Sequence, residues 1–201
     1  MSRRVAAMIV VGAVALAGVL ALVWLLWRDG GGRGPGGLDE AEPEGRPATF
    51  ELYFPGEGGY LYGEERELAV TGEAANRARA IVLAVLDGPG EAGRERGLAR
   101  PFPEDVGLLD LYLTPEGTAF VDLGAEGRES PPSGGSLAEM MMVYSVVDSL
   151  ALNLPEVERV ALLWNGVQRE SFSGHLDTSV PLTAEEELLA ASVRERRRAQ
   201  G

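Results

Sequence analysis

The sequence predicts an α+β fold: a mostly antiparallel sheet with two main helices packed on one face, in the order ββαββαβ, plus an N-terminal transmembrane helix and a short C-terminal helix. Three observations lead to this prediction: an uncharged N-terminal run, two helical patterns each preceded by a pair of strand-like segments, and a charged helical pattern at the end. We divide the chain into an N-terminus with an anchor (1–28), a flexible linker (29–47), a folded domain (48–182) and a C-terminal helix with an Arg-rich tail (183–201).

The membrane segment is predicted at Val5–Trp27, which contains no charged residue. Its 23 residues would span roughly 34 Å as a helix, enough for a bilayer core of about 30 Å. The run is long for a signal peptide and no small-residue cleavage site follows it, so we expect an uncleaved anchor. Arg3 and Arg4 place the N-terminus in the cytoplasm. The expected location is therefore the bacterial inner (cytoplasmic) membrane, single-pass, with an extracytoplasmic or periplasmic domain.

Residues 29–47 are rich in Gly, Pro and acidic residues, which is typical of a flexible tether. The spacing G-x-G-x-x-G occurs at 32–37 and again at 88–93. Neither copy is expected between a strand and a helix, so we attribute both to glycine content rather than to nucleotide binding.

The first half of the domain begins with a strand at 50–54, where apolar residues alternate, and a more polar strand at 60–70. A helix follows and ends at DGPG, residues 87–90. The acidic and Arg-rich loop 91–101 is expected to be exposed. The buried face of the helix is predicted to comprise Ala74, Ala78, Ile81, Val82, Val85 and Leu86.

The second half begins with a hairpin, 106–113 and 118–124, around the turn TPEG. Ser136 and Glu139 have the spacing of a capping box at the start of a long helix that Pro155 ends. The inner face of this helix is predicted to comprise Leu137, Met140, Met141, Tyr144, Val147, Ala151 and Leu154.

The segment 157–164 is apolar at nearly every position, which predicts a central strand. Asn165 and Gly166 then turn the chain, and QRESF (168–172) is expected to form one more short strand. The pattern over 183–198 predicts the closing helix, with Glu in its first turn and Arg in its last.

Composition excludes several kinds of chemistry. The chain has no cysteine, no lysine and one histidine, which excludes disulfides, thiolate nucleophiles, Schiff bases and Cys-based zinc or iron–sulfur sites. A formal net charge of −13 argues against a nucleic-acid partner. We expect no cofactor and no metal site.

The single histidine, His175, is followed by Asp177 and lies near serines at 136, 171, 173 and 179, which suggests a hydrolase triad. No G-x-S-x-G sequence presents a nucleophile, so we assign no catalytic residue. We expect instead that the ring of His175 and the Asp177 carboxylate bond nearby backbone, while Leu176, Val180 and Leu182 attach the segment to the core.

Three further clusters have ordinary interpretations beside functional ones. Asp110, Glu116 and Asp122 resemble an acidic patch, but no calcium-loop spacing is present and a solvated strand face is expected. Met140–Met142 would fill the core rather than form an adaptable binding surface. Arginines 194, 196, 197 and 198 either complement a helix end or contact anionic lipid or polymer.

An ordered series of short motifs resembles the GerMN domain of sporulation and spore germination proteins. The series is Leu52-Tyr53-Phe54-Pro55, Leu86 with Gly88-Pro89, Pro103, Gly117-Thr118-Ala119, Val121-Asp122-Leu123, Gly135-Ser136 with Glu139, Leu154-Pro155 with Val157 and Val160, Gly166, and Gly174-His175-Leu176-Asp177 with Pro181-Leu182. Departures occur at Asn153-Leu154-Pro155, Trp164-Asn165 and the loop 91–101, and these bear on surface contacts more than on the fold.

This resemblance implies a domain of membrane-tethered, extracytoplasmic bacterial proteins with no associated enzymatic activity. The expected function is a protein-interaction or scaffold module of a cell-envelope or sporulation-like assembly, with envelope proteins as partners and self-assembly left open. The alternative is binding of a cell-wall component such as a peptidoglycan fragment, in a groove lined by Tyr60, Tyr62 or Trp164. For protein contacts, exposed sheet edges and the loop 91–101 are the expected surfaces.

Overall fold

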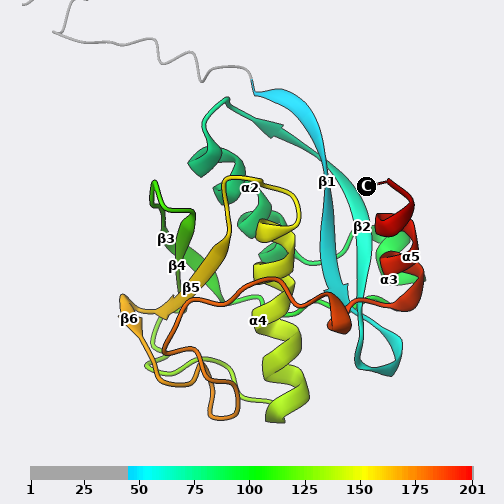
Figure 1. The fold of residues 1–201 in the computed structure, drawn as a ribbon. Coiled ribbons are helices and arrows are strands. Elements are labelled where there is room, and N and C mark those ends of the chain that lie inside the picture. Colours follow the sequence, from blue (N-terminus) through cyan, green and yellow to red (C-terminus); the bar gives the residue numbers. More distant parts are fainter. Residues whose placement is uncertain (1–44, 201) are drawn as a thin grey trace, which may run out of the picture. The chain divides into compact units, whose positions relative to one another are not determined.

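The computed structural model describes residues 45–200 (Figure 1). Within this range no helix is both long enough and apolar enough to cross a membrane, and the predicted anchor and most of the linker lie outside it. The elements are β1 (Arg46–Pro55), η1 (Glu57–Gly59), β2 (Leu61–Val70), α2 (Ala74–Asp87), α3 (Glu91–Glu95), β3 (Gly107–Leu113), β4 (Thr118–Gly124), α4 (Gly135–Ala151), β5 (Arg159–Trp164), β6 (Val167–Gln168), η2 (Glu186–Leu188) and α5 (Ala191–Gln200).

The first two strands form a long antiparallel ribbon of their own. Their register runs from Arg46 opposite Val70 to Pro55 opposite Leu61. The ribbon confirms both predicted strands and starts earlier than expected, because Arg46, assigned to the linker, has a partner residue in β2. Leu52, Tyr53 and Phe54 of β1 are all fully buried: Leu52 and Phe54 join the main core cluster, and Tyr53 joins a second one on the other face.

The second sheet has the order β3-β4-β5-β6. The predicted hairpin is confirmed, since β3 pairs antiparallel with β4. The strands form two sheets and not the single sheet predicted, although three of the four strand pairs are antiparallel as expected. The exception is β4 with β5, which run parallel. The physical reason is the connection: α4 carries the chain across the sheet between these strands, and a helical crossover returns the next strand in the same direction. The last predicted strand, 168–172, is reduced to Val167–Gln168.

The two main helices contact both sheets. In Figure 1, α2 and α4 lie between the β1–β2 ribbon and the four-stranded sheet, with α2 against β3 and α4 against β5. α4 runs along the outer edge of β1, where Ser149 Oγ accepts a hydrogen bond from the Tyr53 N–H at 2.9 Å. One turn later, Asn153 accepts from the Glu51 N–H and donates to the Glu51 carbonyl. Side chains of α4 and of the turn that follows it therefore occupy the edge of β1 where another strand would pair.

Since α4 is enclosed by β1, β5 and α2, its buried surface is wider than one stripe. Met141 and Met142 are both buried, and Met140 is partly buried. Leu137, predicted on the inner face, is 51% exposed because the first turn of α4 projects past the core. The predicted capping box is also wrong: Gly134 occupies the N-cap and Glu139 bonds a distant loop.

The segment 91–101 was predicted to be an exposed loop, and this prediction is wrong in part. It contains α3, in which Gly93 is buried, and Leu98 after the helix is buried as well. The burial follows from the apolar character of Leu98, which joins the same core cluster as Phe102.

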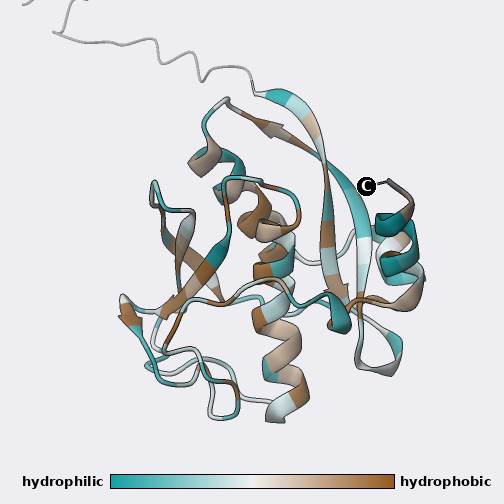
Figure 2. Cartoon of the chain, viewed as in Figure 1, coloured by the Kyte–Doolittle hydropathy of each residue, from teal (hydrophilic) through white to brown (hydrophobic). Residues whose placement is uncertain are grey.

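The C-terminal segment forms a short 3₁₀ turn and a helix that starts at Ala191, later than predicted. Leu189 and Ala190 separate them; both are buried and the Ala190 N–H bonds the Leu61 carbonyl, which interrupts the helix. The predicted acidic first turn is therefore in η2, while arginines end α5 as expected. Figure 2 shows α5 in a mixture of hydrophilic teal and paler or brown portions, and Val193 is buried against the β1–β2 ribbon and α4 as part of the second core cluster.

Candidate functional site

An apolar groove with a volume of about 680 Å³ lies where the β1–β2 connection, the segment before β3 and the start of α4 meet. Grooves of this size with mostly apolar walls are the usual form of a binding site. Its only charged lining residue is Arg100. The lining residues are Pro55, Gly56, Gly59, Arg100, Pro101, Phe102, Pro103, Pro132, Ser133, Gly134, Leu137, Ala138, Met141 and Met142.

The wall made by the β1–β2 connection requires small residues. Gly56 faces the ring of Tyr62, and a Cβ there would come within 2.5 Å of the ring. Gly59 has φ near +74°, and a Cβ at this position would press on Leu137 at 3.1 Å. The turn and the exposed side chain of Leu137 are therefore packed against each other, which fixes one side of the groove.

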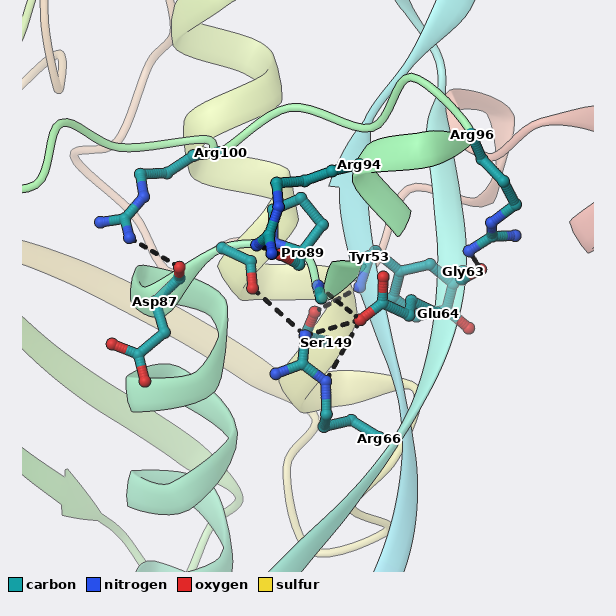
Figure 3. Close-up of polar contacts among 12 residues, drawn as sticks. Tyr53, Gly63, Glu64, Arg66, Asp87, Pro89, Arg94, Arg96, Arg100 and Ser149 are labelled. Carbon is teal, nitrogen blue, oxygen red and sulfur yellow. Dashed lines mark hydrogen bonds and ion pairs between the residues drawn. The ribbon is translucent and has the colours of Figure 1, made fainter. Parts of the chain in front are cut away.

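The opposite wall is held by a buried carboxylate. Glu64 Oε1 accepts hydrogen bonds from Arg66 Nη2 at 2.6 Å and from the Gly90 N–H at 2.9 Å (Figure 3). Burial by itself would raise the pKa of Glu64, but these donors bring the pKa below its usual value. Gly93 must lack a side chain because a Cβ there would collide with Glu64 Oε2. Glu64 thus fastens α3 onto β2.

Three arginines of the same segment donate to main-chain carbonyls. Figure 3 shows Arg94 bonded to Pro89, Arg96 to Gly63 and Arg100 to Asp87. The Ala99 N–H also donates to the Pro55 carbonyl at 2.8 Å, which joins this segment to the end of β1. These bonds position Arg100 and the Pro101-Phe102-Pro103 sequence along the groove.

Trp164 is not in a groove. It is 1% exposed, its Nε1 donates to the Arg128 carbonyl, and its ring meets Phe172 edge-on at 6.1 Å. Phe172 in turn contacts Phe102 edge-on at 6.4 Å. The predicted groove lined by Tyr60, Tyr62 or Trp164 is therefore wrong for Trp164, because a residue of β5 faces the core.

His175 lies in a second hollow, whose lining also includes Asp177 and Ser171. Its Nδ1 is 3.0 Å from Glu139 Oε2, and its own N–H donates to the same oxygen. Glu139 also accepts from Ser171 Oγ and the Ser173 N–H. The ring of His175 was predicted to bond nearby backbone, and this is wrong, because it bonds a carboxylate of α4. Asp177 does bond nearby backbone as predicted, since it accepts from the Ser179 N–H.

Glu139 is fully buried, and these donors determine its charge state. Burial alone would raise the pKa of Glu139, but the backbone N–H groups of Ser173, Leu176 and His175, with the His175 ring, bring it below the usual value. The carboxylate therefore organises the 171–176 loop. Leu182 is partly buried as expected, whereas Val180 is 60% exposed and does not attach the segment to the core.

The loop lacks the arrangement that nucleophilic catalysis requires. In the part of the chain that the structure describes, no serine hydroxyl is hydrogen-bonded to His175. Ser171 Oγ donates to Glu139 and accepts from the Gly174 N–H, and Ser179 Oγ donates to Asp177. A triad needs a hydroxyl on the free ring nitrogen of the histidine. The hydrogen bonds of the serines, His175 and Asp177 therefore stabilise the loop and do not form a triad.

The remaining clusters have individual roles. Asp110 pairs with Arg79, and Asp122 accepts from the Gly166 N–H. Among residues 45–200 no group of carboxylates and histidine has metal-binding geometry. Of the four arginines near the C-terminus, Arg196 pairs with Glu51 and Arg197 donates to the Tyr53 hydroxyl, so these two fasten α5 to β1.

The groove itself was not predicted from the sequence. Its residues come from segments up to 87 residues apart, from Pro55 to Met142, and no local pattern connects them. The available signal was the proline that ends the first strand, Pro55, and the prolines at 101, 103 and 132 in loops, together with an apolar residue, Leu137, in the first turn of a helix.

Comparisons with known proteins agree with this fold. Residues 51–170 match the family Germane, described as sporulation and spore germination. The structure resembles the tandem GerMN domains of the sporulation protein GerM from Bacillus subtilis, with a TM-score of 0.54 and 19% identity over 69% of this chain and 46% of that one. It also resembles the first GerMN domain of the same protein, with a TM-score of 0.50 and 18% identity over 72% and 98% of the two chains.

The chain spans about half the length of the tandem-domain structure. No curated protein matches it. The family match covers more than half of the 201 residues and includes β2, both main helices and the four-stranded sheet. The chain therefore belongs to the Germane family of sporulation and spore germination domains.

Proposed function

We propose that this chain is a non-enzymatic protein-interaction module of a bacterial cell-envelope or sporulation-like assembly, and that the apolar groove is its partner-binding surface. The observation that carries this proposal is the groove, whose walls are apolar except for Arg100 and Ser133. Leu137 exposes half of its surface there. Covering a large apolar side chain with a partner removes this surface from water, which favours binding.

The lining favours a polypeptide over a peptidoglycan fragment. Sugar hydroxyls need hydrogen-bond partners when they are buried, and the groove offers one hydroxyl and one guanidinium among its side chains. Four prolines in the lining supply no N–H donors. Apolar side chains of a protein partner fit these walls better than a glycan does.

The test is site-specific photo-crosslinking in native membranes. A photoreactive phenylalanine analogue replaces Leu137 in one variant and Leu109 in a control, because Leu109 is also a leucine, is 54% exposed and lies on β3 outside the groove. We expect a discrete protein adduct from position 137 and none at the same mass from position 109. Identical adducts at both positions, or recovery of glycan from position 137, would contradict the proposal.

We further propose that the uncharged run Val5–Trp27 anchors the chain in the inner membrane with the domain on the extracytoplasmic side. The support is the sequence pattern. The test is protease treatment of intact spheroplasts. Cleavage of the domain while a cytoplasmic marker protein stays intact is the expected result, and protection of both would refute it.

A further inference from the structure

We infer that the groove takes an amphipathic helical segment of the partner, with a carboxylate of that segment against Arg100. This inference rests on the proposed function, since it specifies the occupant of the same groove. Three features of the lining carry it: the kind of apolar side chains, the absence of strand edges and the position of the single cation.

The apolar wall is formed by the first two turns of α4. Leu137 is the exposed part of this wall, and Met141 and Met142, 6% and 5% exposed, form its buried base. Methionine side chains are unbranched and adjust to the shape of the residues that cover them. Grooves with such walls bind the apolar face of a helix, whose side chains at i, i+3, i+4 and i+7 enter together.

Strand addition does not suit this site. Pro55 is the only lining residue that belongs to a strand, it has no N–H, and its carbonyl already accepts the Ala99 N–H. A partner strand would therefore find no ladder of main-chain groups. A proline-rich partner is also disfavoured, because such segments pack on exposed aromatic rings, and the one aromatic residue of the lining, Phe102, is 2% exposed.

Arg100 determines the charge of the occupant. One of its nitrogens, Nη2, donates to the Asp87 carbonyl at 2.7 Å, and no carboxylate of residues 45–200 forms an ion pair with it. A guanidinium has five N–H donors, so most of them are left for an acceptor on a partner. Carboxylates match this geometry with two parallel hydrogen bonds. A second copy of this chain is a poorer occupant, because two molecules of net charge −13 repel each other.

The experiment uses the full-length chain in lipid nanodiscs and designed helical peptides of about 16 residues, a length at which helices become stable in water. One peptide carries leucines at i, i+3, i+4 and i+7 with glutamates beside this stripe. A second has lysine at each glutamate position, and a third is proline-rich. Binding is measured by fluorescence anisotropy, and the Met141 and Met142 methyl signals in the NMR spectrum report whether the groove is occupied.

We expect the glutamate peptide to bind at least about tenfold more tightly than the lysine peptide and to shift both methionine signals. Leu137→Asp should weaken this binding by about tenfold or more, while the matched variant Leu109→Asp changes it by less than about twofold. Arg100→Glu should reverse the preference between the two peptides. Circular dichroism confirms that each variant is folded.

Equal affinity for the two helical peptides, or an unchanged preference in Arg100→Glu, would overturn the inference. Methionine shifts with the proline-rich peptide alone would overturn it too, yet would leave the groove as a protein-binding surface. Failure of the proposed function is recognised separately, by the lack of any protein adduct at position 137 in the crosslinking experiment.

Discussion

Replacement of Asp148 by asparagine should make the stability of this protein less dependent on pH. Asp148 is fully buried in α4, and its Oδ1 accepts the Glu185 N–H at 2.9 Å. The other oxygen, Oδ2, is buried without a partner. Burial, with the negative charges of Glu185 and Glu186 nearby, raises the pKa of Asp148 from 3.8 to about 7, although the Glu185 N–H and Arg197 act in the opposite direction.

The sign of the effect follows from proton binding. Between pH 3.8 and 7 the folded state holds a proton on Asp148 that the unfolded state has lost, so the free energy of unfolding falls as the pH rises. The loss ends above the folded-state pKa. With these two pKa values the loss is on the order of 4 kcal/mol in all, of which about 2 kcal/mol falls between pH 5.5 and pH 8.

Asparagine keeps the acceptor for the Glu185 N–H and cannot ionise. It places an amide nitrogen at the position of Oδ2, which costs about 1–3 kcal/mol at every pH if that nitrogen stays unpaired. The difference in unfolding free energy between Asp148→Asn and the native chain should therefore shift by about 2 kcal/mol in favour of the variant from pH 5.5 to pH 8.

Urea unfolding followed by circular dichroism at four or more pH values measures this difference, and the range stays above the isoelectric point near 4.6. Carbon NMR of the Asp148 carboxyl gives its titration directly, with a midpoint expected near 7. A pH-independent difference between the two proteins, or a carboxyl that titrates near 4, would refute the reasoning.

Three further predictions concern the buried polar contacts. Glu139→Gln should cost about 1–3 kcal/mol of stability at pH 7 and accelerate hydrogen exchange at the Ser173 and His175 amides; unchanged exchange would contradict the role of Glu139 in the loop. Because the pKa of Glu139 is lowered from 4.5, its contribution should be fully present above that ordinary value and be lost as the pH falls below it. Gly93→Ala should displace α3 from Glu64 and speed tryptic cleavage at Arg94. Gly107→Ala is the control, because Gly107 has nothing within 4 Å of an added Cβ and no positive φ. Trp164→Phe should destabilise the fold by about 1–3 kcal/mol through loss of the bond to the Arg128 carbonyl, and a melting temperature within a degree of native would count against it.

Local patterns predicted the elements well. The period of the apolar residues from Ala78 to Leu86 gave the helix α2, and the turn chemistry of 114–117 gave the hairpin. These signals are reliable because the interactions that they reflect lie within a few residues of each other in the chain.

The arrangement of the sheets and the site could not be predicted in the same way. The edge of β1 is occupied by Ser149 and Asn153, which lie about 100 residues further along the chain and have no distinguishing local pattern. The role of Glu139 was predicted wrongly for a related reason: its spacing from Ser136 suggests a local cap, while its hydrogen bonds go to residues 171–175. Trp164 was assigned to a groove although a strand apolar on both faces leaves such a residue in the core.

The amide of Asn153 meets Glu51 as the peptide group of a neighbouring strand would, with one hydrogen bond in each direction. This side chain therefore blocks the edge of the ribbon, where the main chain of another protein could otherwise pair with β1. Pairing of β1 with a strand of another protein is therefore suppressed at this edge, and association is left to surfaces that recognise side chains.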